Sequence, residues 1–184
     1  MGINYLVMQI KGGRWQYNVG LVLLYTGDGK GKTTAALGLV LRAVGHGYRV
    51  IIAHLMKTLI YRGEYVGEYL AIKKFLSGYV DVFSLDPDQH LTPRDVLKTA
   101  LSRAMEIKPF LLILDEVNNA VTNGYLTTRE VIDGIKSLSP EVNVVLTGRD
   151  APREFMELAD LITVMEAEKH YFNKGVVGVE GLEW

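Results

Sequence analysis

Short apolar runs recur along the chain and alternate with longer segments of helical, amphipathic pattern. Because these runs are largely apolar, rather than apolar at every second position, they are typical of strands buried on both faces of a parallel sheet. The pattern predicts an α/β fold with a mostly parallel six-stranded sheet and helices on both faces. The six predicted strands are residues 20–25, 49–55, 80–84, 110–114, 142–147 and 161–164.

The segments between these strands carry helix start signals. Thr92-Pro93 with Asp95 opens one helix, residues 127–130 offer a capping box for another, and residues 150–154 open the last helix. The predicted loops therefore recur at the carboxyl ends of strands, and in open α/β sheets ligands bind at that edge. Motifs found at strand ends are for this reason the first candidates for function.

Residues 1–19 stand apart from the alternation. Residues 5–10 and 14–19 predict two strands joined by a glycine turn at residues 11–13, which together would form a hairpin. Such an arm could cover a sheet edge, reach a second subunit or have no functional role. We expect all 184 residues to form a single domain, with the arm at its start.

The composition excludes several classes of protein and partner. The net charge is −1 and no long basic block is present, which argues against nucleic acid as the partner. No apolar run approaches the ~18 residues that a membrane span needs, so we expect no membrane association and a cytoplasmic protein. The chain has no cysteine, which excludes disulfides, thiolate metal sites and cysteine nucleophiles.

The most informative motif is the glycine-rich loop between the first predicted strand and the first helix. Glycines let backbone N–H groups surround phosphate oxygens, Lys32 can reach the outer phosphates, and the Thr33 hydroxyl can ligate Mg²⁺. The order of strand, loop and helix predicts that this loop binds the triphosphate of ATP. The candidate ATP-binding residues are Gly27, Asp28, Gly29, Lys30, Gly31, Lys32, Thr33 and Thr34.

This loop departs from the common phosphate-loop pattern by its length. The strict form, G-x-x-x-x-G-K-T, requires glycine at position 26, where this chain has Thr26. Counted from Gly27, the loop is one residue short. A shorter cradle would seat the triphosphate differently from that of an ordinary kinase or ATPase.

A second element of the nucleotide site is the apolar run at residues 110–114, which ends in Asp115 and Glu116. Mg²⁺ prefers hard oxygen ligands and keeps several waters, so Thr33, a carboxylate and the phosphates would suffice to bind it. We therefore expect Thr33, Asp115 and Glu116 to be the metal ligands, the alternative for the two acids being to cap the following turn. Glu116 could also activate water in a hydrolysing ATPase.

At this point several motifs together resemble a known family, the P-loop type of ATP:corrinoid adenosyltransferase. The resemblance rests on the shortened loop and its helix, on the acidic strand end, on a T-G-R-D-A-P block and on two C-terminal signatures. It thins between residues 58 and 110, where Thr58 replaces a glycine of the family and the family's G-F-T-W stretch is not visible. The matching segments are residues 25–38, 42–47, 114–119, 146–152, 158–161, 168–175 and 181–184.

The resemblance implies a RecA-like fold with strand order 3-2-4-5-1-6 and a homodimer. It also implies transfer of the 5′-deoxyadenosyl group of ATP to the Co(I) of a reduced corrinoid, with release of triphosphate and with a reductase as the partner that supplies Co(I). Family members bind ATP in the reverse sense to kinases. Lys32 and Glu116 would be the catalytic residues, with Lys32, Mg²⁺, the loop amides and Lys30 stabilising the leaving triphosphate.

The resemblance also suggests residues for the corrinoid or for other substrate contacts. For Arg149, a salt bridge to Asp150 or Glu154 is an equal alternative to a substrate contact. For Arg42, a solvated or ion-paired position on the surface is an equal alternative. His46, His54 and His90 lack metal-ligand spacing, which favours structural roles for them. The candidates for corrinoid or substrate contacts are Arg42, Lys57, Glu64, Arg149, Lys169 and His170.

Two other functions remain open from the sequence. One is a RecA-like ATPase that acts on a partner, with Glu116 as the base that activates water. The other is a paralogue that keeps the ATP site but has lost the corrinoid, as the missing G-F-T-W stretch permits.

Overall fold

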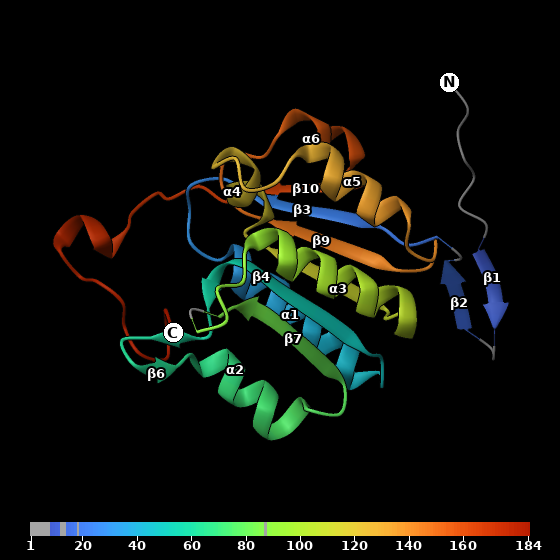
Figure 1. Ribbon diagram of the computed structural model, residues 1–184, viewed down its shortest axis with the longest axis horizontal. Helices are drawn as coiled ribbons and strands as arrows, with labels where there is room; N and C mark the ends of the chain where they lie inside the picture. Colours follow the sequence, from blue (N-terminus) through green and yellow to red (C-terminus); the bar gives the residue numbers. More distant parts are fainter. Residues whose placement is uncertain (1–7, 12–13, 18, 87) are drawn as a thin grey trace.

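The structure, a computed structural model, describes residues 8–11, 14–17, 19–86 and 88–184. Its centre is a six-stranded sheet in which every pair of neighbouring strands is parallel (Figure 1). Numbered among themselves along the chain, the strands lie in the order 3-2-4-5-1-6, which is the order that the resemblance implies. From one edge to the other they are β7 (Val80–Leu85), β4 (Val50–Thr58), β8 (Leu111–Asp115), β9 (Asn143–Thr147), β3 (Val22–Thr26) and β10 (Leu161–Val164).

Helices cover both faces of the sheet, as the sequence predicts. Alternate residues of a strand point to opposite faces, so Ile51 and Leu112 belong to one core cluster while Ile52 and Ile113 belong to the other. The first cluster packs under α3, α4, α5 and α6, and the second packs under α1 and η1. The elements are α1 (Lys32–Gly45), α3 (Pro93–Ile107), α4 (Val117–Thr122), α5 (Thr128–Lys136), α6 (Arg153–Leu158) and η1 (Ile72–Leu76).

The predicted helix start signals are confirmed at two helices. The Thr92 side chain accepts from the backbone of Asp95 at the start of α3, and the Thr127 side chain accepts from that of Glu130 at the start of α5. In each case the acid bonds back to the N-cap backbone, so that both capping boxes are complete. Local polar residues thus set where these helices begin.

Two small hairpins lie outside the main sheet. β1 (Met8–Lys11) pairs antiparallel with β2 (Arg14–Tyr17), as expected of the N-terminal arm, while residues 5–7 and the predicted glycines of the turn lie outside the described residues. The second hairpin, β5 (Ile60–Tyr61) with β6 (Glu64–Tyr65), follows β4, and the short helix α2 (Gly67–Ala71) comes next. The hydrophobic pattern did not predict this second hairpin.

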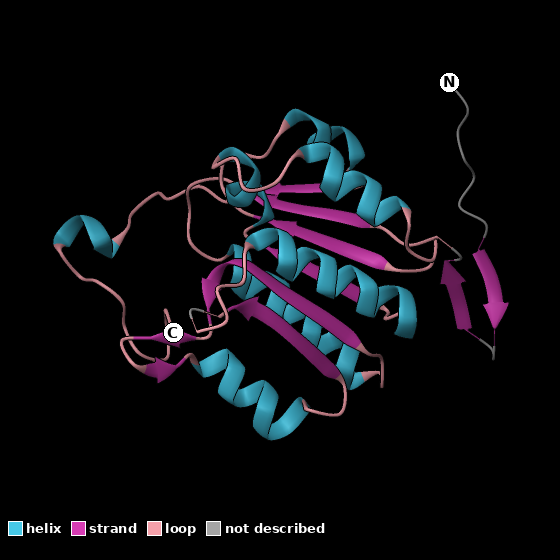
Figure 2. Cartoon of the chain, viewed as in Figure 1, coloured by secondary structure: helices cyan, strands magenta, loops and turns pink. Residues whose placement is uncertain are grey.

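The carboxyl ends of the strands face the C-terminal tail, and the N-terminal hairpin lies at the other end of the sheet (Figures 1 and 2). The tail, residues 165–184, is mostly loop and contains one 3₁₀ turn, η2 (Tyr171–Lys174). None of the helices in the described part of the chain is both long and apolar enough to cross a membrane. The architecture therefore directs attention to the edge where the strands end.

Candidate nucleotide site

The glycine-rich loop follows β3 and leads directly into α1. Gly27 and Gly31 have φ angles of 96° and 119°, which side chains other than glycine rarely adopt. The loop lies against the backbone after β10, where the amide of Gly29 donates to the carbonyl of Met165 at 2.7 Å. A Cβ on Gly29 would come within 2.8 Å of the backbone of Met165 and Glu166. The glycines therefore allow the loop both its turn and this close approach.

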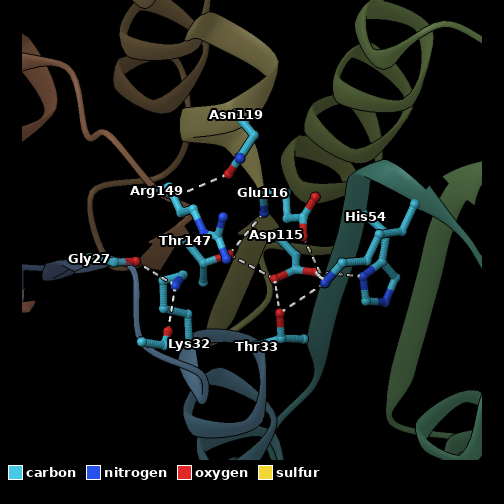
Figure 3. Close-up of polar contacts among 11 residues, drawn as sticks. Gly27, Lys32, Thr33, His54, Asp115, Glu116, Asn119, Thr147 and Arg149 are labelled. Atoms are coloured by element: carbon cyan, nitrogen blue, oxygen red, sulfur yellow. Dashed lines mark hydrogen bonds and ion pairs between the residues drawn. The ribbon is translucent and has the colours of Figure 1, made fainter. Parts of the chain in front are cut away.

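Lys32 is the first residue of α1, and its side chain folds back over the loop. Its ammonium donates to the carbonyls of Gly27 at 2.6 Å and Gly29 at 2.7 Å (Figure 3). Burial lowers the pKa of Lys32 below its ordinary value, and the nearby charge of Arg149 lowers it further. The charge of Lys32 is thus held inside the curve of the loop, where the amides would surround a phosphate.

Asp115 is fully buried at the end of β8 and accepts hydrogen bonds from several neighbouring elements. Its Oδ1 accepts from the hydroxyl of Thr33 at 2.8 Å and from that of Thr147 at 2.7 Å (Figure 3). The ring nitrogen Nδ1 of His54 lies 2.9 Å from its Oδ2. Burial acts to raise the pKa of Asp115, but the hydrogen bond from His54 and the charge of Lys57 outweigh it, so that this pKa lies well below its usual range.

Glu116 follows at once and leaves the strand with a φ of 58°. Its amide donates to the Thr147 hydroxyl at 2.8 Å, so Thr147 links the two acids through one oxygen. Its carboxylate forms an ion pair with Lys57, and its side chain is 29% exposed and lines the cavity at the carboxyl edge of the sheet. One acid is thus fixed in the interior, and the other faces the cavity.

Lys57 lies beside both acids. Its ammonium is 3.0 Å from Glu116 Oε1, 3.3 Å from Asp115 Oδ2 and 3.1 Å from the Thr33 hydroxyl. Burial acts to lower the pKa of Lys57, but the two carboxylates outweigh it, so that this pKa lies above its ordinary value. Lys57 is therefore a firmly charged cation at the acidic strand end.

An open cavity of about 820 Å³ at the carboxyl edge of the sheet is lined by Lys32, Thr33, Lys57, Glu116 and Thr147. Its floor is the glycine-rich loop with Glu116, Thr147 and Arg149, and its roof comes from the C-terminal tail. A neighbouring cavity of about 500 Å³ lies between the β5–β6 hairpin and the same tail. The residues that line both cavities are Lys57, Glu68, His170, Phe172 and Glu183.

The C-terminal tail contacts the loop through Lys30. The Lys30 ammonium donates to the carbonyl of Leu182 at 2.7 Å and lies 2.9 Å from the carboxylate of Glu183. The tail also contacts the β5–β6 hairpin, because the ring centroid of Trp184 lies 5.5 Å from that of Tyr61. Lys30 thus bonds the tail that covers the cavity.

The structure brings most of the predicted site residues to the larger cavity, including all of positions 28–34, and Glu116. Of the candidates for corrinoid contacts, it brings Lys57, Arg149 and His170 there. The Nε atom of Arg149 lies 3.9 Å from Oδ1 of Asp28. Asp28 is neither of the predicted salt-bridge partners, Asp150 and Glu154.

Three candidates do not line either cavity. Arg42 is exposed on the last turn of α1, about 15 Å along the helix axis from Lys32. Glu64 lies on the exposed hairpin, and Lys169 is exposed beside His170. In the part of the chain that the structure describes, none of the three side chains lines the larger or the smaller cavity.

Two residues that hold the acidic strand end were not among the predicted site residues. Thr147 ends β9, and His54 lies within the buried part of β4, directly opposite Asp115 in the register of the sheet. Thr147 is a polar residue at the end of an apolar run, His54 is a polar residue within one, and both strands neighbour β8. That position, combined with the expected strand order, was the available signal.

Comparisons with known proteins identify the family to which the chain is similar. The family described as "ATP:corrinoid adenosyltransferase BtuR/CobO/CobP" matches residues 18–184. A corrinoid adenosyltransferase of Sinorhizobium sp is 32% identical over 176 residues, which cover 90% of this chain and 80% of that protein. One of Escherichia coli (strain K12) is 30% identical over 169 residues, which cover 90% of this chain and 86% of that protein.

A solved structure supports the fold alone. The flagellar accessory protein FlaH from Methanocaldococcus jannaschii superposes with a TM-score of 0.55 at 14% identity, covering 80% of this chain and 71% of that one. At so low an identity the likeness carries no argument about activity. It agrees with the α/β fold that the sequence pattern predicts.

Proposed function

Because the chain belongs to the ATP:corrinoid adenosyltransferase family, we propose that it transfers the 5′-deoxyadenosyl group of ATP to the Co(I) of a reduced corrinoid. The observation that carries this proposal is the convergence of three elements on one cavity. The shortened glycine loop, the Asp115–Glu116 strand end and the tail with the family's signatures all line it or lie directly beneath it.

The chemistry requires little from the protein beyond position and charge. Co(I) supplies an electron pair that forms the bond to C5′, the bond from C5′ to the ester oxygen breaks, and its pair leaves with the triphosphate. Since the nucleophile is already strong, no general base is needed. The amides of the loop and the charge of Lys32 would bind the triphosphate and stabilise the negative charge that develops on it.

The side chains at the acidic strand end fit Mg²⁺. Thr33, Asp115 and Glu116 offer a hydroxyl and two carboxylates, and their oxygens already surround a cation, the ammonium of Lys57. The described residues contain no group of three or more His, Asp or Glu side chains that could hold a metal, so phosphates and waters would complete the shell. When bound, Mg²⁺ would neutralise charge on the triphosphate.

The corrinoid would approach from the side of the smaller cavity. That cavity adjoins the phosphate site through Lys57 and His170, and it is lined by aromatic and apolar residues of the hairpin and tail. A corrinoid with its amide side chains is too large to enter the smaller cavity entirely. The corrinoid would therefore cover the opening of this cavity, and the C5′ atom of ATP would face it from inside the site. For Glu64, Lys169 and Arg42, contact with the corrinoid stays a prediction.

The remaining parts of the proposal concern the protein's setting. By its family, the chain would act as a homodimer in the cytoplasm, as one nucleotide-binding domain, with a reductase that supplies Co(I). The N-terminal hairpin is the element to examine for contacts between subunits.

The test is the identity of the products. With ATP, Mg²⁺ and a chemically reduced corrinoid, the protein should form adenosylated corrinoid and triphosphate in equal amounts. Formation of ADP and phosphate, independent of corrinoid, would instead identify a RecA-like ATPase. ATP binding with neither reaction would identify a paralogue that has lost the corrinoid.

Replacement of Glu116 by Gln separates the two roles considered for this acid. Loss of affinity for Mg²⁺ with ATP is the expected result, because Gln weakens a metal ligand. Accumulation of bound, uncleaved ATP with unchanged affinity for Mg²⁺ would instead indicate a base that activates water. Lys32→Ala should abolish either activity and therefore serves as the inactive control.

A further inference from the structure

The ammonium of Lys57 lies among the three side chains that the proposed function assigns to the metal. It is within 3.0 to 3.3 Å of an oxygen of Thr33, of Asp115 and of Glu116. Lys57 reaches this position from β4, whose register with β7 shifts between His54 and Thr58. The position is therefore held by an irregularity of the strand and by three separate polar contacts.

An ammonium and a divalent cation cannot share this position. Mg²⁺ binds its oxygens at about 2.1 Å, so an ion among the same three side chains would lie almost in contact with the ammonium. The repulsion between these like charges is large where the surroundings are partly buried. For the metal to bind, Lys57 must withdraw.

Asp115 does not depend on Lys57 for its hydrogen bonds. It already accepts from Thr33 and Thr147, and His54 lies against its other oxygen. The other cations near the cavity are engaged elsewhere, since Lys32 bonds loop carbonyls and Arg149 lies beside Asp28. Lys57 is thus the cation that neutralises the two acids together.

We propose that Lys57 is a tethered cation which occupies the metal position until nucleotide binds, and so makes binding of a divalent metal depend on nucleotide. The inference rests on the proposed function only for the identity of the three ligands. Without nucleotide, a metal gains three protein oxygens but must separate the Lys57 ammonium from both Asp115 and Glu116.

Nucleotide changes this balance in two ways. The triphosphate gives the metal further oxygen ligands, and it gives the displaced ammonium an anionic partner. The side chain of Lys57 is 40% exposed and lines both cavities, so its flexible stem can turn toward the phosphates without crossing the core. Metal and ATP then bind cooperatively. ATP offers the displaced Lys57 a partner, and the metal offsets the negative charge of the triphosphate beside the two acids.

The experiment measures binding of Mn²⁺, a paramagnetic substitute for Mg²⁺, by electron paramagnetic resonance in the absence of nucleotide. The unmodified protein should bind Mn²⁺ weakly, and Lys57→Met should bind it about tenfold more tightly or better, because the competing charge is gone. Lys57→Arg keeps the positive charge, so this variant should bind Mn²⁺ as weakly as the unmodified protein. Lys98→Met, on the exposed face of α3, controls for the general loss of a positive charge.

Thermal unfolding provides a second measurement and controls for folding. Mn²⁺ alone should raise the melting temperature of Lys57→Met more than that of the unmodified protein, since ligands stabilise the state that binds them. Equal Mn²⁺ affinity in the two proteins would overturn the proposal. So would Mn²⁺ affinity in Lys57→Met that survives a second change, Glu116→Gln, because the ligands would then be different.

These outcomes are separable from those of the proposed function. Mn²⁺ binding is measured without corrinoid, so absence of adenosyl transfer would reject the activity and leave the role of Lys57 standing. Conversely, an active enzyme whose Lys57→Met variant shows no gain in Mn²⁺ affinity would reject only the tethered cation.

Discussion

The two sides of the larger cavity are built differently. The phosphate side, which is the side proposed to bind the triphosphate, consists of strand ends and a helix start, and its central residue, Asp115, is fully buried and bonded to three other elements. The tail side consists of loops whose large apolar residues are exposed, with Phe172 at 63% and Leu182 at 64%. In the described residues, the polar contacts that join the tail to the loop are those of Lys30 and Gly29.

This difference in burial suggests that the two sides bind different substrates. A triphosphate has one shape and charge, and a site for it can be built rigidly into the sheet edge. A corrinoid is large, and a surface of exposed apolar residues on loops can adapt to it and become buried on binding. Mutations on the phosphate side should therefore affect folding and every substrate, whereas mutations on the tail side should affect one substrate and leave folding intact.

The largest effect should come from Asp115→Ala. It removes a buried carboxylate and leaves Lys57 and His54 without their shared partner, which should cost about 3 to 5 kcal/mol of unfolding free energy. Unfolding in urea measures this. The matched control is Asp133→Ala on the exposed face of α5, which should stay within about 0.5 kcal/mol. A small effect at Asp115 would show that the phosphate side is not the rigid one.

Gly29→Ala tests the close approach of the loop to the tail's first residues. The new Cβ would meet the backbone of Met165 and Glu166, so the loop must shift, and kcat/KM should fall by about 10- to 100-fold. Steady-state kinetics with ATP give the comparison. Gly38→Ala on the exposed face of α1 is the control, since its Cβ meets nothing and the helix should gain about 0.5 to 1 kcal/mol. Equal activity of the two variants would contradict the argument.

Phe172→Ala tests the tail side. Because the ring is mostly exposed, stability should change by less than about 0.5 kcal/mol. The KM for corrinoid should rise by about three- to tenfold with little change for ATP, if the ring becomes buried on binding. Phe75→Ala is the control, because Phe75 is 70% exposed on η1 and belongs to neither cavity lining. An unchanged corrinoid KM would remove the tail from the corrinoid site.

The smallest effect should come from Glu183→Gln, which weakens the ion pair with Lys30. Both side chains are about a third exposed, and such pairs contribute less than about 1 kcal/mol, so the KM for ATP should rise less than about fivefold. High salt should remove the difference between variant and unmodified protein. Glu180→Gln, an exposed position in the same tail, is the control. A much larger effect would mean that the tail is as firmly built as the phosphate side.

The sequence alone determined the strands of the sheet, the starts of α3 and α5 and the place of the glycine-rich loop between β3 and α1, whereas the strand order followed from the resemblance. It could do so because these features are local: apolar runs, polar caps and glycines act within a few residues of each other. It did not predict the β5–β6 hairpin, since each strand has only two residues and the turn, Arg62-Gly63, has arginine where Asn or Asp usually marks such a turn.

Only the tertiary structure decided which side chains meet at the acidic strand end. His54 reaches Asp115 because β4 and β8 pair in one particular register, and Lys57 reaches both acids because β4 is irregular beyond that point. Shifting either strand by one residue would turn these side chains to the other face. Likewise, the bond between Lys30 and the tail spans more than 150 positions. The sequence thus supplied the cations and acids, and the packing of the sheet decided which of them share a site.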